Sequence, residues 1–250
     1  MTEYSKGLPH GLNTGLRQWQ SGALARALVT AESELLIAVL GDVFGLELLQ
    51  LGLWGRGREL LRGSRIRRNT LVAAVHSDAQ SPDIIASPAG LPIASGSIDA
   101  VLLPHCLEIE PDPYAVLREA DRVLLGEGQI IVLGFRPMSL WGLRAAASRT
   151  GFPPGFARVL SESRLRDWLV LLGFEVTLTR HYLYVAPTEP NGAQQPEVVR
   201  PGMLKRGWVN PLPAGGYLLK ARKRVYSATP IRPRRRERRA ILGSLANPST

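Results

Sequence analysis

The stretch LPIASGSIDAVLLPHCLEIEPDPYAVLREADRVLLGEG, residues 91–128, contains a strand and a helix in the order of a β–α crossover. The apolar run 98–103 predicts a buried strand. Asp112-Pro113 predicts a helix start, because an Asp side chain caps free backbone N–H groups and proline is tolerated in the first helical turn. The apolar face of this helix recurs at helical spacing in Val116, Leu117, Ala120, Val123 and Leu124. The next apolar run, 129–133, predicts the following strand.

The same alternation continues on both sides of this segment. Upstream, 16–40 predicts one or two helices, 57–61 the start of another, and 46–51, 70–75 and 84–85 predict strands. Downstream, Ser161 predicts the cap of a helix that ends near residue 172, and 174–185 and 216–225 predict two strands with no helix between them. Alternating strands and helices imply an α/β fold with a mostly parallel sheet, and the last two strands imply an antiparallel pair at one edge. In such sheets, ligands bind beyond the carboxyl ends of the strands, where the strand order reverses.

Composition excludes several classes of protein. A hydrophobic content of 45% across 250 residues supports a folded core, so a wholly disordered chain is excluded. Cys106 is the single cysteine, which excludes a disulfide framework and Cys-based metal sites. The first fifteen residues lack the pattern of a signal peptide, and Asp42 and Glu47 interrupt the most apolar segment, 35–54. We therefore expect a soluble, cytoplasmic protein without a metal site.

Strings around the central segment resemble the type 11 family of class I S-adenosylmethionine-dependent methyltransferases. They are Leu91-Pro92, the strand from Gly96 to His105, Leu107-Glu108, Asp112-Pro113, Leu117-Arg118-Glu119 and Arg122-Val123-Leu124. The segments 165–174 and 215–224 resemble the family's helix before its sixth strand and its last strand. The resemblance implies a Rossmann-like sheet of seven strands and transfer of a methyl group from S-adenosyl-L-methionine to an unidentified acceptor. It divides the chain into an N-terminal helical extension (1–41), a methyltransferase-like domain (42–226) and a basic tail expected to be disordered (227–250).

The glycine-rich loop of the family is altered in this sequence. Gln50 stands where the family has an acidic residue, and Trp54 replaces the second glycine. Gly52 matches the family, and Gly55 is expected to support an altered turn. The positions that the family uses to contact the cofactor fall on Gly52, Gly55, His76 or Asp78, Ser87 and Leu103. His76 and Asp78 are alternatives for the ribose, and Ser87 stands where an acidic residue usually meets the adenine.

The resemblance also locates the acceptor side. His105 follows the fourth strand, and its reference pKa near 6.5 makes it the best candidate for a general base. Arg136 and Trp141, which follow the fifth strand, are candidates for binding the acceptor. The structural alternatives are that His105 packs or caps a turn and that Trp141 plugs a hydrophobic lid. Glu108 is expected to orient a loop, and Cys106 to belong to the core.

Positive charge concentrates at the end of the sequence. Residues 220–250 contain ten Lys or Arg and one Glu, whereas the formal charge of the whole chain is +10. The densest part, Arg232–Arg239, suits nucleic acid, another polyanion or an anionic membrane surface. A second basic cluster comprises Arg56, Arg58, Arg62, Arg65, Arg67 and Arg68. The alternative function is therefore a catalytically inactive scaffold that binds RNA or an acidic partner through its Arg-rich tail.

Overall fold

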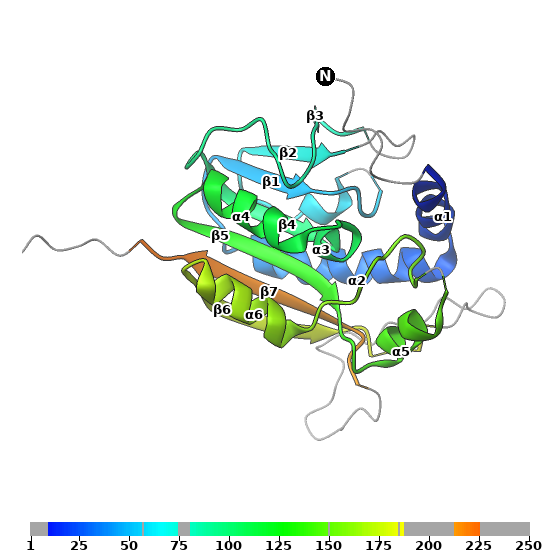
Figure 1. The fold of residues 1–250 in the computed structure, drawn as a ribbon. Coiled ribbons are helices and arrows are strands. Elements are labelled where there is room, and N and C mark those ends of the chain that lie inside the picture. Colours follow the sequence, from blue (N-terminus) through cyan, green and yellow to red (C-terminus); the bar gives the residue numbers. More distant parts are fainter. Residues whose placement is uncertain are drawn as a thin grey trace, which may run out of the picture.

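The computed structural model describes residues 10–56, 58–74, 81–149, 151–184, 186–187 and 213–225, with the backbone alone for 10–14. The helices are α1 (His10–Gln20), α2 (Ala23–Leu40), the 3₁₀ turn η2 (Glu59–Leu61), α3 (Cys106–Ile109), α4 (Pro113–Val123), α5 (Leu140–Ala147) and α6 (Glu162–Leu171). The strands are β1 (Glu47–Leu51), β2 (Arg68–Ala73), β3 (Ile84–Ile85), β4 (Ile98–Pro104), β5 (Leu124–Phe135), β6 (Phe174–Tyr182) and β7 (Gly216–Lys223). Figure 1 shows their arrangement.

The strands form one seven-stranded sheet in the order β3-β2-β1-β4-β5-β7-β6. Strands β1 to β5 pair in parallel, whereas β7 is antiparallel to both β5 and β6. The predicted fold class, a mostly parallel sheet with an antiparallel C-terminal pair, is thus confirmed. The strand order reverses between β1 and β4, because the chain passes from β1 outward to β2 and β3 and then returns to the other side of β1.

Helices cover both faces of this sheet. In Figure 1, α4 and α6 lie in front of the sheet and α2 lies behind it. Successive residues of a strand point to opposite faces, so Leu48 belongs to the core on the α2 side and Leu49 to the core on the α4 side. The central strands are therefore buried on both faces, as expected for a parallel sheet.

The predicted start of α4 is confirmed in detail. The Asp112 carboxylate accepts a hydrogen bond of 3.0 Å from the backbone N–H of Ala115, and Pro113 is the first residue of the helix. Val116, Leu117, Ala120 and Val123 are fully buried on the face predicted for them. Ser161 likewise caps α6, through its hydroxyl and the backbone N–H of Arg164.

The structure differs from several of the predicted elements. Between β1 and β2 the described residues form only the single 3₁₀ turn η2, where a helix was expected to begin. Strand β5 begins at Leu124, directly after α4, and is longer than the predicted run 129–133. Helices α3 and α5 were not predicted. No helix formed by the described residues is long and apolar enough to cross a membrane.

Candidate functional site at the β1–β4 switch point

The first part of the site is the turn that follows β1. Gly52 has φ 95°, a left-handed conformation that favours glycine, and its N–H donates to the carbonyl of Val72. The side-chain amide of Gln50 donates to the Gly52 carbonyl at 3.2 Å. Gln50 therefore holds the turn by donating a hydrogen bond, although it stands where the family has an acidic residue.

The same glutamine has an oxygen without a partner in the described part of the chain. The Gln50 side chain is only 1% exposed, and its Oε1 is buried and forms no hydrogen bond with any described residue. A buried acceptor in this state costs about 1–3 kcal/mol. The oxygen lies at the carboxyl end of β1, beside the strand-order reversal, where α/β sheets bind ligands. It suits a ligand that brings an N–H or O–H donor.

The next residues fasten the turn to α2. Trp54 is buried, and its Nε1 donates a hydrogen bond of 2.6 Å to Glu32 Oε2. Gly55 has φ 79°, and a Cβ there would lie 3.0 Å from Val29 Cγ1 of α2. Trp54 thus fills the position of the second glycine and points toward α2, where it becomes part of the core.

Glu32 of α2 is the centre of a buried polar network. Its Oε1 accepts hydrogen bonds from Tyr182 Oη at 2.9 Å and from His105 Nε2 at 2.8 Å, and its Oε2 accepts the bond from Trp54. The carboxylate is fully buried and contacts donors from three separate segments of the chain. Sequence reasoning missed Glu32; the available signal was an acidic residue between Leu28 and Leu36, on the apolar face of a predicted helix.

His105 lies between two carboxylates and between two aromatic rings. Its Nδ1 is 2.7 Å from Glu108 Oε2, and its ring centroid is 4.4 Å from those of both Trp54 and Phe135. Burial lowers the pKa of His105, but the charge of Glu32 and hydrogen bonds to Glu108 and Glu32 outweigh it and raise the pKa to about 9. The imidazole is therefore protonated at neutral pH and donates from both nitrogens.

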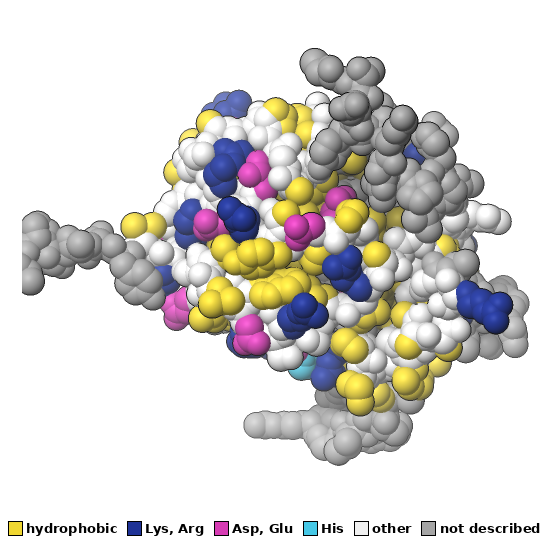
Figure 2. All heavy atoms as spheres, viewed as in Figure 1, with side chains coloured by type: hydrophobic (Ala, Val, Ile, Leu, Met, Phe, Trp, Pro, Cys, Tyr) yellow, Lys and Arg dark blue, Asp and Glu magenta, His cyan; other side chains and the backbone are white. Residues whose placement is uncertain are grey.

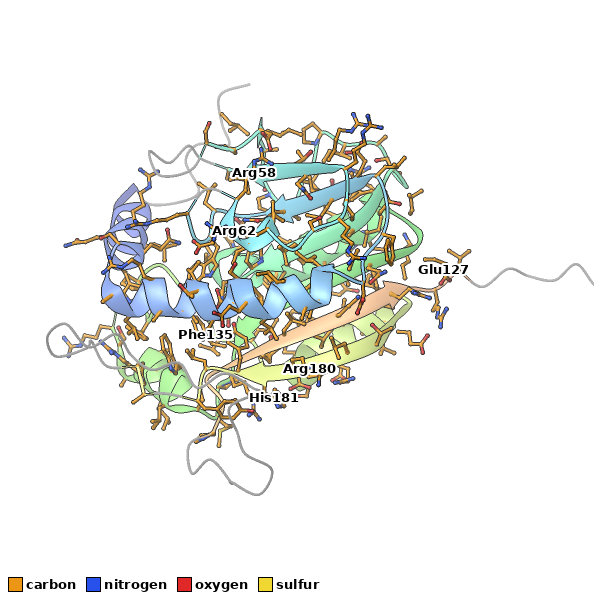
Figure 3. All side chains as sticks on the ribbon, turned by 180° about the vertical axis from the view of Figure 1, so that it is seen from behind. Arg58, Arg62, Glu127, Phe135, Arg180 and His181 are labelled. Carbon is orange, nitrogen blue, oxygen red and sulfur yellow. The ribbon has the colours of Figure 1, made fainter. Side chains whose placement is uncertain are left out.

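Glu108 links His105 to the end of β5. Its Oε1 accepts a hydrogen bond of 2.8 Å from the backbone N–H of Phe135. Burial raises the pKa of Glu108, although the hydrogen bond and charge of His105 oppose this. Burial, together with the charge of Glu32, also raises the pKa of Tyr182. Figure 3 shows Phe135 beside α2, on the face that this helix covers. The network thus joins α2 to the ends of β4, β5 and β6.

His105 also has an unusual backbone conformation. Its φ of 56° and ψ of 8° place it in the left-handed region, which costs a non-glycine residue about 1–3 kcal/mol. Such conformations persist where the surroundings hold them, and they concentrate at functional sites. Here His105 is the last residue before α3, directly after β4, and the two carboxylates and two rings hold it.

The structure brings some of the predicted site residues together. Gly52, Gly55 and His105 lie around Trp54, and Trp141 joins them because it stacks on Phe135 at a centroid distance of 5.2 Å. Trp141 is buried and fills space in the core of the α2 side. Arg136 is half-buried, and its backbone N–H donates to the Gly215 carbonyl at 2.8 Å.

The other predicted residues lie apart from this group. Leu103 is fully buried in the core on the α4 side of the sheet. Ser87 is half-buried after β3, and its hydroxyl accepts a hydrogen bond of 3.2 Å from the N–H of Ala89. His76, Asp78 and the basic run Arg232–Arg239 lie outside the described residues. Within the described part of the chain, no group of three or more His, Cys, Asp or Glu side chains could hold a metal ion.

Comparison with known proteins supports the fold. Residues 57–132 match the family model described as a methyltransferase domain. An S-adenosylmethionine-dependent methyltransferase of Thermotoga maritima superposes with a TM-score of 0.61 at 19% identity, covering 83% of this chain and 94% of that one. A 1,6-didemethyltoxoflavin-N1-methyltransferase of Burkholderia thailandensis, solved with S-adenosylhomocysteine, superposes with a TM-score of 0.51 at 18% identity, covering 90% and 94%. The chain is therefore a protein of the class I methyltransferase fold, as the resemblance in its sequence implied.

Curated relatives match over shorter stretches. The Escherichia coli protein YafS is 37% identical over 123 residues, which are 48% of this chain and 50% of YafS. The Mycobacterium tuberculosis protein Rv2003c is 29% identical over 177 residues, which are 68% of this chain and 60% of that protein. The chain thus spans about half to three fifths of the length of these relatives.

Proposed function

We propose that this protein is an S-adenosylmethionine-dependent methyltransferase that acts on an acceptor still to be identified. The observation that carries the proposal is the turn at the β1–β4 reversal, where Gly52 keeps the left-handed conformation and Gln50 Oε1 is buried without a partner among the residues that the structure describes. The family model and the fold support the same activity. When bound, S-adenosylmethionine would supply an electrophilic methyl group.

The residues present fit such a cofactor at the turn itself. Gly52 allows the backbone to approach a ligand closely, and Gln50 Oε1 can accept a hydrogen bond from an ammonium group. Ser87 would contribute a hydroxyl near the adenine, and His76 or Asp78 would contact the ribose. For Gly55 and Leu103 the proposed role is structural support of the turn after β1 and of the end of β4, because both residues are packed into the core.

The acceptor side depends on the state of His105. A general base must accept a proton, and both ring nitrogens of His105 are already bound to carboxylates. His105 can act as the base only after its proton passes to Glu32 or Glu108 and one ring nitrogen becomes free. Methyl transfer requires chiefly that donor and acceptor be positioned in line. We therefore favour positioning by the network. Arg136 is the proposed contact of the acceptor, and Trp141, which is buried against Phe135, is proposed to support that side of the site.

Calorimetric titration and thermal unfolding with S-adenosylmethionine and S-adenosylhomocysteine test the proposal. A ligand at a hundred times its dissociation constant adds about 2.7 kcal/mol of stability, or roughly 2–4 °C for each kcal/mol in a protein of this size. Binding of both compounds supports the proposal. Absence of heat and of any shift at millimolar ligand would overturn it.

A variant of the unpartnered glutamine sharpens the test. Gln50→Met keeps the volume but removes Oε1, so cofactor affinity should fall by about tenfold, the value of one hydrogen bond to a charged donor. The stability of the free protein should change by no more than about 1 kcal/mol, because the lost donor to Gly52 is offset by removal of the unpartnered oxygen. Leu171→Ser, on exposed α6, is the matched control and should leave affinity unchanged.

A further inference from the structure

Exposed apolar side chains gather at one end of the sheet, opposite the turn after β1 that contains Gly52. Parallel strands β1, β2, β4 and β5 begin there and β7 ends there, at the left of Figure 1. Five of the ten large hydrophobic side chains that are exposed among the described residues belong to the last turns of α2, the turn into β1, the start of β5 and the residues after β7: Ile37, Phe44, Leu46, Leu125 and Val225. Phe44 is 69% exposed and Leu46 is 64% exposed. We call these five residues the strand-start surface.

The turn that presents Phe44 and Leu46 is firmly held. Asp99 Oδ2 accepts hydrogen bonds from the backbone N–H groups of Leu46 and Glu47, at 2.8 Å and 3.0 Å. Val43, the neighbour of Phe44, is buried in the core. The backbone therefore fixes both apolar side chains in an outward position, where they remain in water without a partner in the described chain.

Exposed basic side chains adjoin this turn. The backbone N–H of Arg68 donates to the Leu46 carbonyl at 3.0 Å, so the start of β2 lies directly beside Leu46. Arg68 forms an ion pair with Glu47, whereas Arg65 and Arg67 are exposed and have no ion pair with any described residue. Figure 3 shows Glu127, near the start of β5, at the same end of the molecule.

The densest positive charge of the chain is covalently attached to the same end. Val225 follows β7, and Arg232 is the seventh residue after it. The segment Arg232–Arg239, with six arginines and one glutamate, thus follows this end of the sheet in the sequence and lies outside the described residues. The described basic side chains beside the surface are Arg65 and Arg67. This combination of fixed apolar side chains and nearby basic charge is typical of proteins that lie on an anionic bilayer.

We propose that the strand-start surface binds an anionic phospholipid membrane, with Phe44 and Leu46 entering the interface and Arg65 and Arg67 facing the headgroups. Aliphatic side chains such as Leu46 and Ile37 gain from entering lipid but cannot stack on nucleic-acid bases as an RNA site requires. Bound in this way, the protein would direct the β1–β4 switch point away from the membrane. The proposal is independent of cofactor binding.

Hydrophobic side chains also gather over α4 and α6, where Figure 2 shows basic and acidic side chains interspersed on both sides. Val170 and Leu171 of α6 are exposed, but α6 ends beside the strand-start surface, because the Arg224 N–H, next to Val225, donates to the Gly173 carbonyl. Leu143 of α5 therefore provides the internal comparison. It is 61% exposed and follows the carboxyl end of β5, at the opposite end of the sheet, so it should remain in water when the protein meets vesicles.

Site-specific fluorescence tests the proposal in the full chain. Cys106 is the single cysteine and is 2% exposed, so Phe44→Cys can be labelled selectively with the environment-sensitive dye NBD. Leu143→Cys is the matched control, because Leu143 is 61% exposed on α5 at the opposite end of the sheet. Vesicles of phosphatidylcholine with about one-third phosphatidylserine should shift the emission of the dye at position 44 to shorter wavelength and leave position 143 unchanged. Vesicles of phosphatidylcholine alone should shift neither.

Partition measurements separate the surface from the Arg-rich segment. The double variant Phe44→Ser, Leu46→Ser should lower partitioning onto anionic vesicles about tenfold or more, and Arg65→Gln and Arg67→Gln about fivefold each. Because these side chains are exposed, thermal unfolding should be preserved in the double variant and in both single variants. Unchanged partitioning of the serine double variant would show that the Arg-rich segment alone binds lipid, and would overturn the proposal. Salt-sensitive binding of single-stranded RNA without any binding to vesicles would overturn it in favour of a nucleic-acid surface.

Discussion

Glu32 Oε1 on α2 lies 2.8 Å from His105 Nε2 at the end of β4, and neither side chain is exposed to solvent. A buried ion pair thus joins α2 to the end of β4, through two residues that are seventy-three positions apart in the sequence. Burying charges is costly unless they are paired and their remaining hydrogen-bonding groups are satisfied. Here Trp54, Tyr182 and Glu108 supply the remaining partners, so the network is closed around His105.

Removing the charge of Glu32 should destabilise the protein strongly. In Glu32→Gln the imidazolium of His105 loses one of its two counter-charges inside the core, and breaking a buried pair costs about 3–5 kcal/mol. Urea unfolding at pH 7 measures the change. The control is Glu34→Gln, an exposed position on the same helix, which should change stability by no more than about 0.5 kcal/mol. Equal effects of the two variants would contradict the network as described.

The contribution of His105 should depend on pH in a defined direction. Its pKa is raised from 6.5 to about 9 in the folded protein, so folding favours the protonated form. The associated stability is fully present below pH 6.5 and is lost as the pH rises through 9. The groups that face the imidazole are Glu32 from α2, Glu108 from α3 and, through Glu32, Tyr182 from β6.

Comparison with His105→Gln isolates this effect. The difference in unfolding free energy between the unaltered protein and the variant should be largest near pH 6 and should shrink as the pH rises toward 9. Denaturant midpoints measured between these two pH values provide the test. A difference that stays constant over the whole range would mean that folding leaves the pKa of His105 unchanged, and would contradict the raised value.

The hydrogen bond from the Tyr182 hydroxyl to Glu32 links β6 to α2, and removing that hydroxyl tests the link. Tyr182→Phe removes the donor to Glu32 and leaves the ring in place, so the carboxylate loses one of its three hydrogen bonds. The expected loss is about 1–3 kcal/mol, because the bond involves a charged, buried acceptor. Tyr114→Phe, at a half-buried position of α4, should cost less than about 0.5 kcal/mol. Near-equal midpoints for the two variants would show that Glu32 does not depend on Tyr182.

Local signals in the sequence predicted much of the fold. They could not predict which side chains contact one another in the site. Asp112-Pro113 predicts α4 because the capping carboxylate of Asp112 and the backbone N–H of Ala115 that it accepts from are close together in the sequence. The partners of Glu32 come from positions 54, 105 and 182, and neither periodicity nor capping links such distant residues. Only an acidic residue on an apolar helical face indicated that a buried partner exists.

The missing helix after β1 has a similar explanation. Residues 57–61 carry a helical pattern, but the chain must pass close beneath α2. A Cβ at Gly63 would overlap the backbone of Ile37, so α2 occupies the space that a longer helix would need. Tertiary packing thus overrides a local preference, and η2 retains a single turn that packs against α2.

The last prediction concerns the turn itself. Gly52→Ala places a side chain at φ 95°, where an alanine is strained, while the nearest atom of the neighbouring chain, Cys106 Cβ, is an ordinary 3.5 Å away. The cost should therefore come from backbone strain and exceed about 1 kcal/mol. Gly90→Ala is the control, because a Cβ there meets nothing within 4 Å and the backbone lies outside the left-handed region. That change should be neutral or stabilise by about 0.4–1 kcal/mol. If the Gly52 variant also binds S-adenosylmethionine more weakly while Gly90→Ala does not, the turn acts on both stability and ligand affinity; unaltered affinity in a destabilised Gly52→Ala protein would limit its role to the fold.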